Sequence, residues 1–453
     1  RQLLATRKAP RPPPSRGAKP AIEPTLDFVG LLSIQGVIPN PQREAKEYKT
    51  GDERVINVAS ARLVANKRLS ALAQAMGLEY GRHYATDAEI GGLNYGCVVI
   101  CTDQDKDGVG KIAALILSWF YKFWPELIRA GRIRRLMTPL VRARRPGRGA
   151  PRGRALEFYY DEEVDEWKRV TPDWRAYAMT YYKGRAAHSR QDVTDMAARF
   201  NEMIYTYVED DTTAELFDVY FGAASAPRRA ALAAPRAPIT PEEILAIHRA
   251  REIPIGRVQL AYETRAYKTA VAAQQLPNEI DDQTEVQRKI VHWALRHWNR
   301  PRKAEMKVYQ IAGFVAAEEG YHKGNASIEG ATTSAAKGFT NARFYPLLDG
   351  VGQFGNRHGD EAGSARYVGA RRHRRLAKLF PPADLDHLGA VVVDGTPAEP
   401  PRLVPVVPLA ALESYRGVTE GWNHNSYGRD PAAVVAVVEA YTRGDAELTA
   451  LAE

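Results

Sequence analysis

The feature that most constrains this chain is a strongly apolar segment that ends in a cluster of acids. Residues 96–102 (GCVVICT) form an apolar run with β-branched residues, which is typical of a buried strand. Asp103, Asp105 and Asp107 follow it at alternate positions, and residues 111–124 then show the pattern of a helix. A strand, a polar turn and a helix in this order predict an α/β region whose acidic side chains lie at the end of a strand.

The three aspartates favour a site for a hard divalent cation. Carboxylates held this close repel one another unless a cation lies among them. Mg²⁺ prefers oxygen ligands, and one or two carboxylates often bind it together with a substrate phosphate. A calcium loop of the EF-hand type would need a glutamate at position 114, which is Ala114. The alternative is an acidic turn that caps the next helix, and the residue types leave both interpretations open.

Length and charge narrow the class of protein further. A chain of 453 residues exceeds one ordinary domain, so two or three domains are expected. Lys and Arg number 63 against 54 Asp and Glu, and the resulting net charge of +9 favours a polyanionic partner without requiring one. Cys97 and Cys101 fit neither a disulfide framework nor a four-ligand zinc site. No run of 18 apolar residues occurs, so no membrane-spanning helix is predicted.

Changes in composition predict how the chain divides. Residues 1–25 are rich in Arg, Pro and Lys, which predicts a flexible basic arm. Residues 223–241 are rich in Ala and Pro, which predicts a linker between domains. Periodicity predicts helices at 61–76, 111–124, 191–200, 241–251, 284–298, 308–318, 368–379 and 432–441, and strands at 96–102, 137–143, 156–160, 177–182, 391–393 and 403–407.

Several separated motifs resemble those of the type IIA DNA topoisomerases, most closely the eukaryotic and large-DNA-virus forms. Residues 98–140 resemble the Toprim domain of these enzymes, and residues 181–184 (YYKG) resemble a segment that follows it. Residues 321–324 (YHKG), 352–357 (GQFGNR) and 364–367 (SARY) resemble the winged-helix part, in the order of the family. The match is specific because several separated motifs keep that order.

The resemblance implies a fold class and a set of domain limits. The expected fold is an α/β Toprim domain with a parallel sheet flanked by helices, followed by a mainly α winged-helix domain and the start of an α+β tower domain. The expected limits are a basic arm at 1–25, the Toprim domain at 26–222, the linker at 223–241, the winged-helix domain with the catalytic tyrosine at 242–390 and the tower segment at 391–453.

The resemblance also implies the cleavage–religation core of a type II topoisomerase, an isomerase that changes DNA topology. Tyr367 corresponds to the nucleophile that forms a transient 5′-phosphotyrosyl double-strand break for strand passage. A phenol with a pKa of about 10 is mostly protonated at neutral pH, so it needs a nearby cation or base. Arg366 is expected to stabilise charge on phosphate oxygens, and His322 or Lys323 to orient or assist the tyrosine.

Cofactor and DNA contacts follow from the same resemblance. Mg²⁺ is expected at Asp103 and Asp105, with Asp107 nearby. Val418 matches the position where an apolar residue of the family wedges between base pairs. The basic run at 371–375, predicted on a helix after the tyrosine, is expected to contact phosphate. Further DNA contacts are expected from Lys183, Gln287, Arg288, Lys289 and Arg357.

The implied partners are double-stranded DNA, a second copy of the chain and an ATPase-domain part or chain. In the implied homodimer, the tyrosine of each protomer faces the metal carboxylates of the other. The resemblance implies no membrane association, and it places the protein in the nucleus or in a viral DNA-replication compartment.

Departures from the family pattern motivate a second interpretation. The metal-binding glutamate of the family falls either at Arg7 or before residue 1. Residues 35–37 (QGV) replace an Arg-Gly-Lys, and Lys323 replaces the second histidine of a YHHG motif. The alternative function is a degenerate topoisomerase-like DNA-binding or structural component of a larger complex, without cleavage activity.

Overall fold

The structure is a computed structural model that describes residues 2–7, 29–34, 37–49, 55–145, 155–182, 190–298, 305–339, 345, 347–393 and 396–444. The chain forms two compact units, Arg1–Thr269 and Ala270–Glu453. Their boundary lies inside the helix α11 (Arg265–Gln275). Most of the basic arm expected at 1–25 lies outside the described residues, and its described part is a strand, β1 (Gln2–Arg7).

The division lies further along the chain than the linker expected at residues 223–241. That segment contains the helix α9 (Ala226–Ala233), in which the buried Arg228 donates hydrogen bonds to carbonyl oxygens of the preceding turn. Beyond it, β11 (Glu252–Pro254) pairs in parallel with β10 (Ile204–Val208). The Ala- and Pro-rich segment is therefore packed into the first unit, because a buried arginine and a following sheet strand hold both of its ends.

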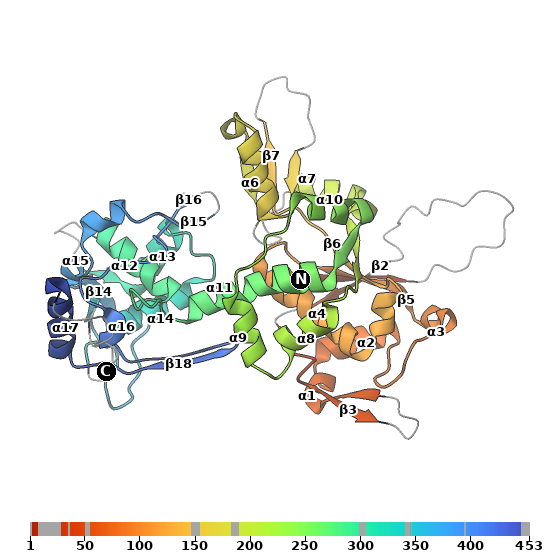
Figure 1. The fold of residues 1–453 in the computed structure, drawn as a ribbon, viewed down its shortest axis with the longest axis horizontal. Coiled ribbons are helices and arrows are strands. Elements are labelled where there is room, and N and C mark those ends of the chain that lie inside the picture. Colours follow the sequence, from red (N-terminus) through yellow and green to blue (C-terminus); the bar gives the residue numbers. More distant parts are fainter. Residues whose placement is uncertain are drawn as a thin grey trace. The chain divides into compact units, whose positions relative to one another are not determined.

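The first unit is built around a six-stranded sheet of mixed direction (Figure 1). Its strand β5 (Tyr95–Cys101) has five consecutive buried residues, as the unbroken apolar sequence predicts. Parallel pairing joins β5 to β6 and β10 to β11, whereas β1 and β2 pair antiparallel, so the sheet is only partly the parallel sheet expected. Across the sheet the order is β11, β10, β6 (Ile133–Leu136), β5, β1 and β2 (Val29–Ser33).

The chain leaves β5 through a tight turn into two consecutive buried helices. The π-helix η2 (Gly108–Ala113) continues into α4 (Ala114–Phe123), and nearly every residue of both is buried. Trp124 leaves helical geometry before Pro125, because a residue before proline disfavours the α region. The other helices of the unit are α1 (Ala61–Val64), α2 (Lys67–Met76), α3 (Asp87–Gly92), α5 (Pro125–Arg129), α8 (Thr213–Phe221), α10 (Pro241–Ala250), the π-helix η6 (Ile255–Thr264) and short 3₁₀ turns at Trp174–Ala176 and Phe200–Met203.

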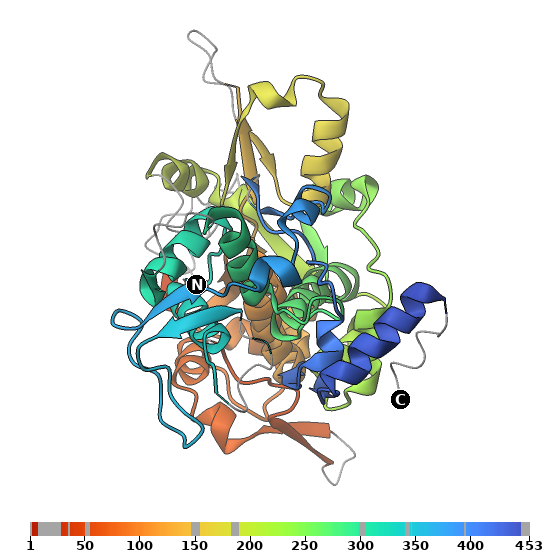
Figure 2. The ribbon, with the colours of Figure 1, turned by 90° about the vertical axis from the view of Figure 1, so that its left-hand side faces the viewer.

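A three-stranded sheet with a helix beside it projects from the first unit (Figure 2). Its central strand β7 (Val141–Arg144) pairs with β8 (Leu156–Phe158) and β9 (Ala178–Tyr181). The helix α6 (Asp161–Val170) packs Val164 and Trp167 onto this sheet, which gives the projection a small core of its own. The unit also contains the hairpin of β3 (Ala45–Lys49) and β4 (Val55–Ala59) and the helix α7 (Arg190–Ala198).

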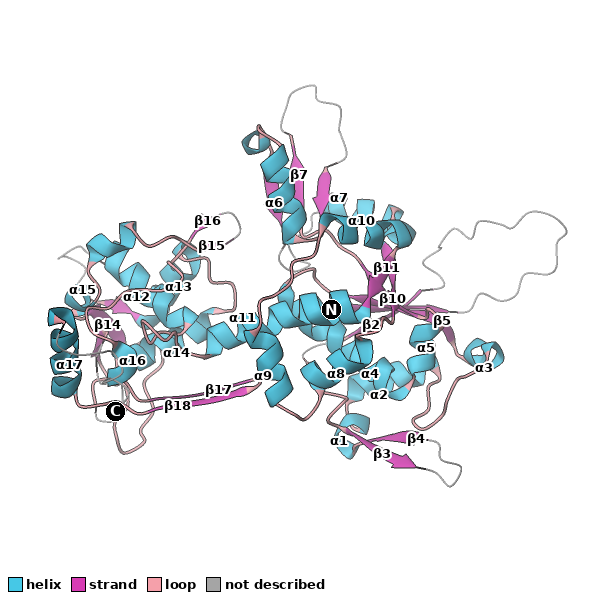
Figure 3. Ribbon diagram, in the orientation of Figure 1, coloured by secondary structure: helices cyan, strands magenta, loops and turns pink. Residues whose placement is uncertain are grey.

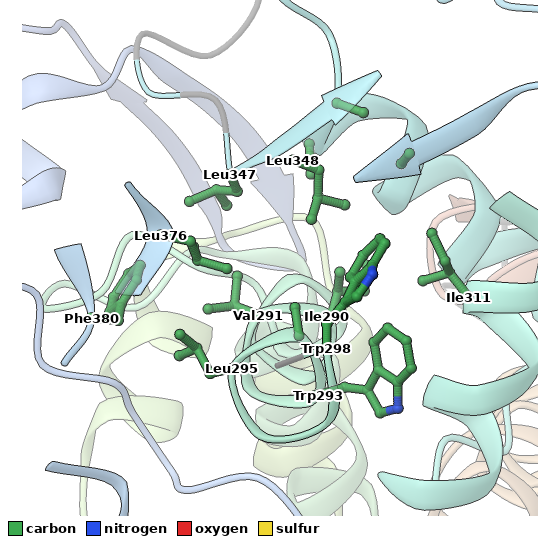
Figure 4. Close-up of a cluster of buried hydrophobic side chains, with 14 of the residues drawn as sticks. Ile290, Val291, Trp293, Leu295, Trp298, Ile311, Leu347, Leu348, Leu376 and Phe380 are labelled. Carbon is green, nitrogen blue, oxygen red and sulfur yellow. The ribbon is translucent and has the colours of Figure 1, made fainter. Parts of the chain in front are cut away.

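The second unit packs helices against a small antiparallel sheet (Figure 3). Its central helix α12 (Glu285–His297) buries Ile290, Val291 and Leu295 against other elements of the unit (Figure 4). Each such side chain contributes about 1.5–3 kcal/mol when it is fully buried. The remaining helices of this group are α13 (Val308–Glu318) and α14 (Asn325–Ala335), and the sheet has the order β12 (Met306–Lys307), β14 (Gly369–Arg372), β13 (Leu348–Val351).

The helix predicted at 368–379 is instead the strand β14 followed by the short helix α15 (Leu376–Leu379). Residues 369–372 pair on both edges, with β12 and β13, and this pairing outweighs their helical periodicity. The strand predicted at 403–407 is not formed. The other elements are Pro382–Asp386 (3₁₀), β15 (Val392–Val393), β16 (Thr396–Pro397), α16 (Leu409–Leu412), β17 (Tyr415–Thr419), β18 (Trp422–Ser426) and α17 (Pro431–Arg443). In the described part of the chain, no helix has the length and apolarity that a membrane crossing requires.

Candidate functional site

The acidic loop lies at the end of β5, as the sequence predicts. Asp103 and Asp105 are half-buried and Asp107 is exposed. The carboxylate Oδ1 of Asp105 accepts a hydrogen bond of 2.6 Å from the backbone N–H of Gly108. A Cβ at Gly108 would lie 2.2 Å from the carbonyl oxygen of Asp103, so glycine is required where the chain turns into η2. The loop therefore caps a helix and also presents carboxylates.

The donor atoms of this loop suit Mg²⁺, although the three aspartates do not converge. Within the described residues, no three His, Cys, Asp or Glu side chains are grouped closely enough to hold a metal. Asp103, Asp105 and Asp107 do not form such a group, and the part of Asp103 and Asp105 in metal binding stays a prediction. Thr102 Oγ1 and Gln104 Oε1, beside Asp103 in the chain, are buried oxygens without a hydrogen-bond partner. Two carboxylates in a setting of oxygen donors fit a cation that takes its remaining ligands from water and phosphate.

The strand β1 does not bring Arg7 to the acidic loop. It runs antiparallel to β5, with Gln2 opposite Cys101 and Arg7 opposite Tyr95. Because Asp103 follows Cys101, Arg7 lies at the other end of β5. The expectation that Arg7 occupies the place of the family's metal-binding glutamate is wrong for this reason.

A buried polar network supports the backbone just after the acidic loop. Gln259, which is fully buried, donates from Nε2 to the carbonyl oxygen of Val109 at 2.8 Å. Its Oε1 accepts from Arg135 and from the hydroxyl of Tyr207. Arg135 forms a bidentate pair with Glu263 at 2.6 and 2.8 Å. Burial alone would lower the pKa of Arg135, but Glu263 raises it above its usual value, so the guanidinium stays charged.

Tyr367 lies in a tight turn just before β14, and 72% of its side chain is exposed. Its backbone N–H donates to the carbonyl oxygen of Ser364 at 2.8 Å, which closes the turn. The guanidinium carbon of Arg366 lies 5.8 Å from the centre of the tyrosine ring. Lys307 donates from Nζ to the Tyr367 carbonyl oxygen at 2.9 Å. An accessible phenol thus has one cation beside its ring and another beside its backbone.

Sequence reasoning missed Lys307. No local motif connects it with residue 367, which is 60 positions away. The pairing of β12 with β14 places Lys307 opposite Gly369, and this pairing brings the lysine to the tyrosine.

His322 and Lys323 are exposed in the turn that precedes α14. The hydroxyl of Tyr321 donates to Ser327 Oγ at 2.9 Å and ties the turn to the first residues of the helix. Lys323 Nζ lies 4.0 Å from a carboxylate oxygen of Glu285, so part of its charge is already balanced. The assistance that both residues are expected to give Tyr367 stays a prediction.

Arg288 and Lys289 are buried, contrary to the DNA contacts expected of them. Arg288 pairs with Asp281 at 2.6 Å, and Lys289 pairs with Glu399 at 2.5 Å. Gln287 closes a capping box at the start of α12. Residues 287–289 therefore stabilise the beginning of this helix, because each of the three side chains has a partner inside the unit.

Comparison with known proteins agrees with this arrangement. A family model that describes the A-subunit of DNA gyrase/topoisomerase IV matches residues 275–452. A second model, the C-terminal associated domain of TOPRIM, matches residues 136–255. The DNA topoisomerase 2 of African swine fever virus is 38% identical over 422 residues, which cover 92% of this chain and 35% of that protein. The chain belongs to the type IIA DNA topoisomerase family.

Other topoisomerases are more distant. A putative mitochondrial DNA topoisomerase 2 of Caenorhabditis elegans is 28% identical over 397 residues, 85% of this chain and 32% of that protein. The crystal structure of the Plasmodium falciparum topoisomerase II DNA-binding, cleavage and re-ligation domain matches with a TM-score of 0.74 at 23% identity, over 86% of this chain and 51% of that one. This likeness supports the topoisomerase fold. The chain spans about a third of the length of the viral relative.

The remaining DNA contacts expected from the topoisomerase resemblance fall in three described places, and one lies outside the described residues. Arg357 is exposed in a loop that Asn356 organises through its hydrogen bond of 2.6 Å to Asp360. Val418 is 65% exposed on β17, the exposure that an intercalating side chain needs. Lys183 lies outside the described residues. The basic run at 371–375 begins on β14 and ends in the turn before α15, not on a helix.

Proposed function

We propose that this chain forms the DNA cleavage–religation core of a type II topoisomerase, with Tyr367 as the nucleophile. The observation that supports this most is the exposed phenol of Tyr367 in the second unit, with Arg366 beside its ring and Lys307 bonded to its backbone carbonyl. Its hydroxyl oxygen attacks a DNA phosphorus, and the bond from that phosphorus to the 3′ oxygen breaks. The phenol loses its proton and the 3′ oxygen gains one. The new phosphotyrosyl bond conserves the energy of the broken strand, so the reverse step reseals the DNA without fuel.

Other residues of the chain serve the same step. Arg366 stabilises charge on the phosphate oxygens, and His322 or Lys323 orients the phenol. Asp103 and Asp105 would hold Mg²⁺, which when bound supplies positive charge near the scissile phosphate. The acidic loop and Tyr367 belong to different units. In the proposed homodimer, which cuts both strands of one duplex, Tyr367 of each protomer faces the acidic loop of the other.

The proposal includes the rest of the assembly. Double-stranded DNA is the substrate, an ATPase part on this or another chain drives strand passage, and the site of action is the nucleus or a viral DNA-replication compartment. The similarity to the viral topoisomerase supports these points.

The test is the formation of protein-linked DNA. The full chain is incubated with supercoiled plasmid and Mg²⁺, and the mixture is quenched with a denaturant. Wild type is expected to give covalent complexes, and Tyr367→Phe, which lacks the attacking oxygen, only background. Tyr441→Phe, at a tyrosine that is 49% exposed on α17, is the matched control and should behave as wild type. Equal background levels from wild type and Tyr367→Phe would show that the proposal is wrong.

The second candidate is a DNA-binding or structural component of a larger complex, without cleavage activity. The departures from the family pattern at residues 35–37 and at Lys323 favour it. In that case plasmid binding persists, but neither Mg²⁺ nor the Tyr367→Phe change affects the amount of covalent complex.

A further inference from the structure

The hairpin of β17 and β18 presents one exposed face around Val418. Its register places Val418 opposite Asn423 and Arg416 opposite Asn425. Directly opposed side chains of an antiparallel pair lie on the same face of the sheet. All four residues are exposed, so they form one accessible surface, named here the hairpin face.

The other side of the hairpin is anchored, which holds the hairpin face outward. The hydroxyl of Tyr415 donates to the carbonyl oxygen of Gln275 at 2.5 Å. The ring of Tyr415 lies across Gly417, where a Cβ would come within 2.3 Å of it. Thr419, on the same anchored side, is buried. The hairpin therefore cannot rotate its outer side chains inward without breaking these contacts.

The polar side chains of the hairpin face have hydrogen-bonding capacity to spare. Within the described residues, the side chains of Arg416, Asn423 and Asn425 make no hydrogen bond and no ion pair. An asparagine amide offers two donors and one acceptor, and an arginine offers five donors. A protein-binding surface would be expected to centre on several apolar or aromatic side chains, whereas this face has only Val418.

We infer that Asn423 and Asn425 read base edges of duplex DNA in the minor groove, beside Val418. The inference rests on the proposed function, which makes duplex DNA the substrate, and on the DNA contact expected at Val418. An apolar wedge flanked by Asn and Arg is the composition that minor-groove proteins use to unstack a base step and read its surroundings. The amide N–H groups can donate to adenine N3 or thymine O2, and the amide oxygen can accept from the guanine 2-amino group. Asn423, directly opposite Val418, reads the step next to the wedge.

The test uses duplexes that differ only in the minor groove. Replacing guanine by inosine removes the 2-amino group, and replacing adenine by 2,6-diaminopurine adds one, while the major-groove edges stay the same. Affinity is measured by fluorescence anisotropy with the full chain carrying Tyr367→Phe, so that no strand is cut. We expect each replacement to change the dissociation constant about three- to tenfold, the effect of one hydrogen bond.

The asparagine variants test whether Asn423 and Asn425 contact the base edges. Asn423→Ala and Asn425→Ala are expected to reduce the response to inosine and diaminopurine to less than about twofold. Asn423→Gln keeps the amide and should retain part of the response. His424→Ala changes the residue between the two asparagines, on the anchored side of the hairpin, and should leave the response intact. Melting curves of every variant check that the changes at these exposed positions leave the fold unaltered.

Two outcomes separate this inference from the proposed function. If wild type forms no covalent complex but its affinity still responds to the minor-groove changes through Asn423 and Asn425, only the proposed function fails. If covalent complexes form but the asparagine variants respond to inosine as strongly as wild type, the hairpin face does not read the groove, and the inference is overturned.

Discussion

At the scale of single residues, a sequence motif does not show whether a side chain is exposed for contact with DNA or buried in the core of its unit. Tyr367 and Val418 are 72% and 65% exposed, which the proposed roles of nucleophile and wedge require. DNA contacts were expected of Arg288 and Lys289 from the same resemblance, yet both are buried against carboxylates. The difference depends on Asp281 and Glu399, which the chain brings to α12 from outside the motif.

Lys289→Met tests the structural role of the buried pair. The change leaves Glu399 in an apolar setting that already raises the pKa of its carboxyl, even with Lys289 beside it. Removing one partner of a buried ion pair costs about 3–5 kcal/mol. We expect a loss of this order in the free energy of unfolding, measured by urea denaturation.

The double variant Lys289→Met/Glu399→Leu removes both charges and serves as the control. It should recover much of the lost stability, because replacing a whole buried pair by apolar residues is often neutral. A single variant that loses less than about 1 kcal/mol would contradict the structural role.

At the scale of elements, local sequence patterns predicted the positions of most helices but not the points where a helix is interrupted. Ser60 caps α1, yet the helix expected at 61–76 stops at Ala65 and restarts, because the side chain of Asn66 accepts from the N–H groups of Arg68 and Leu69. In the segment predicted as a helix at 368–379, residues 369–372 form a strand for a different reason. Its partners in β12 and β13 are distant in the chain, and periodicity carries no information about them.

Gly110→Ala tests the contact between the π-helices η2 and η6, which supports the acidic loop. A Cβ at Gly110 would lie 2.5 Å from the Cβ of Tyr267 and 2.6 Å from the carbonyl oxygen of Glu263. The two helices must then move apart, which costs about 1–3 kcal/mol for overpacking. We expect a lower melting temperature together with weaker Mg²⁺-dependent formation of covalent complexes.

Gly92→Ala is the matched control in the same unit. Gly92 ends α3, and no atom lies within 4 Å of the Cβ that alanine would add. Stability should change by less than about 1 kcal/mol, in the direction of greater stability, since alanine favours the helix. If both variants melt alike, close packing at Gly110 does not support the loop.

At the scale of the whole molecule, charge is distributed over two units that each have their own core. The net charge of +9 includes the exposed Arg357, Arg366 and Arg371 of the second unit. Phosphate contacts of this kind release counterions and carry little sequence information. In the proposed function, the positive charge of the whole chain supplies affinity for DNA, and the inferred contacts of the hairpin face supply its sequence preference.

The affinity of the chain for duplex DNA should fall steeply with salt. A protein that makes about six phosphate contacts loses about a thousandfold in affinity between 50 and 200 mM salt. Anisotropy titrations of the Tyr367→Phe chain over this range measure the slope. Arg357→Ala should reduce the slope by about one phosphate contact, and Arg296→Ala, an arginine that faces Asp386, should not. A slope near zero would contradict binding through phosphates.

Adjacent residues were enough to predict the type IIA topoisomerase family and the buried strand β5 with the acids that follow it. The same local motifs are the source of the roles proposed for Tyr367 and Val418. The folded chain was needed to show that Lys307 contacts the backbone of Tyr367, that Arg7 lies away from the acidic loop, and that residues 223–241 pack into the first unit. It also decided that Asn423 faces the same way as Val418. Each of these contacts joins segments that are distant in the chain. Its free energy depends on the partner segment, which a local sequence pattern does not identify.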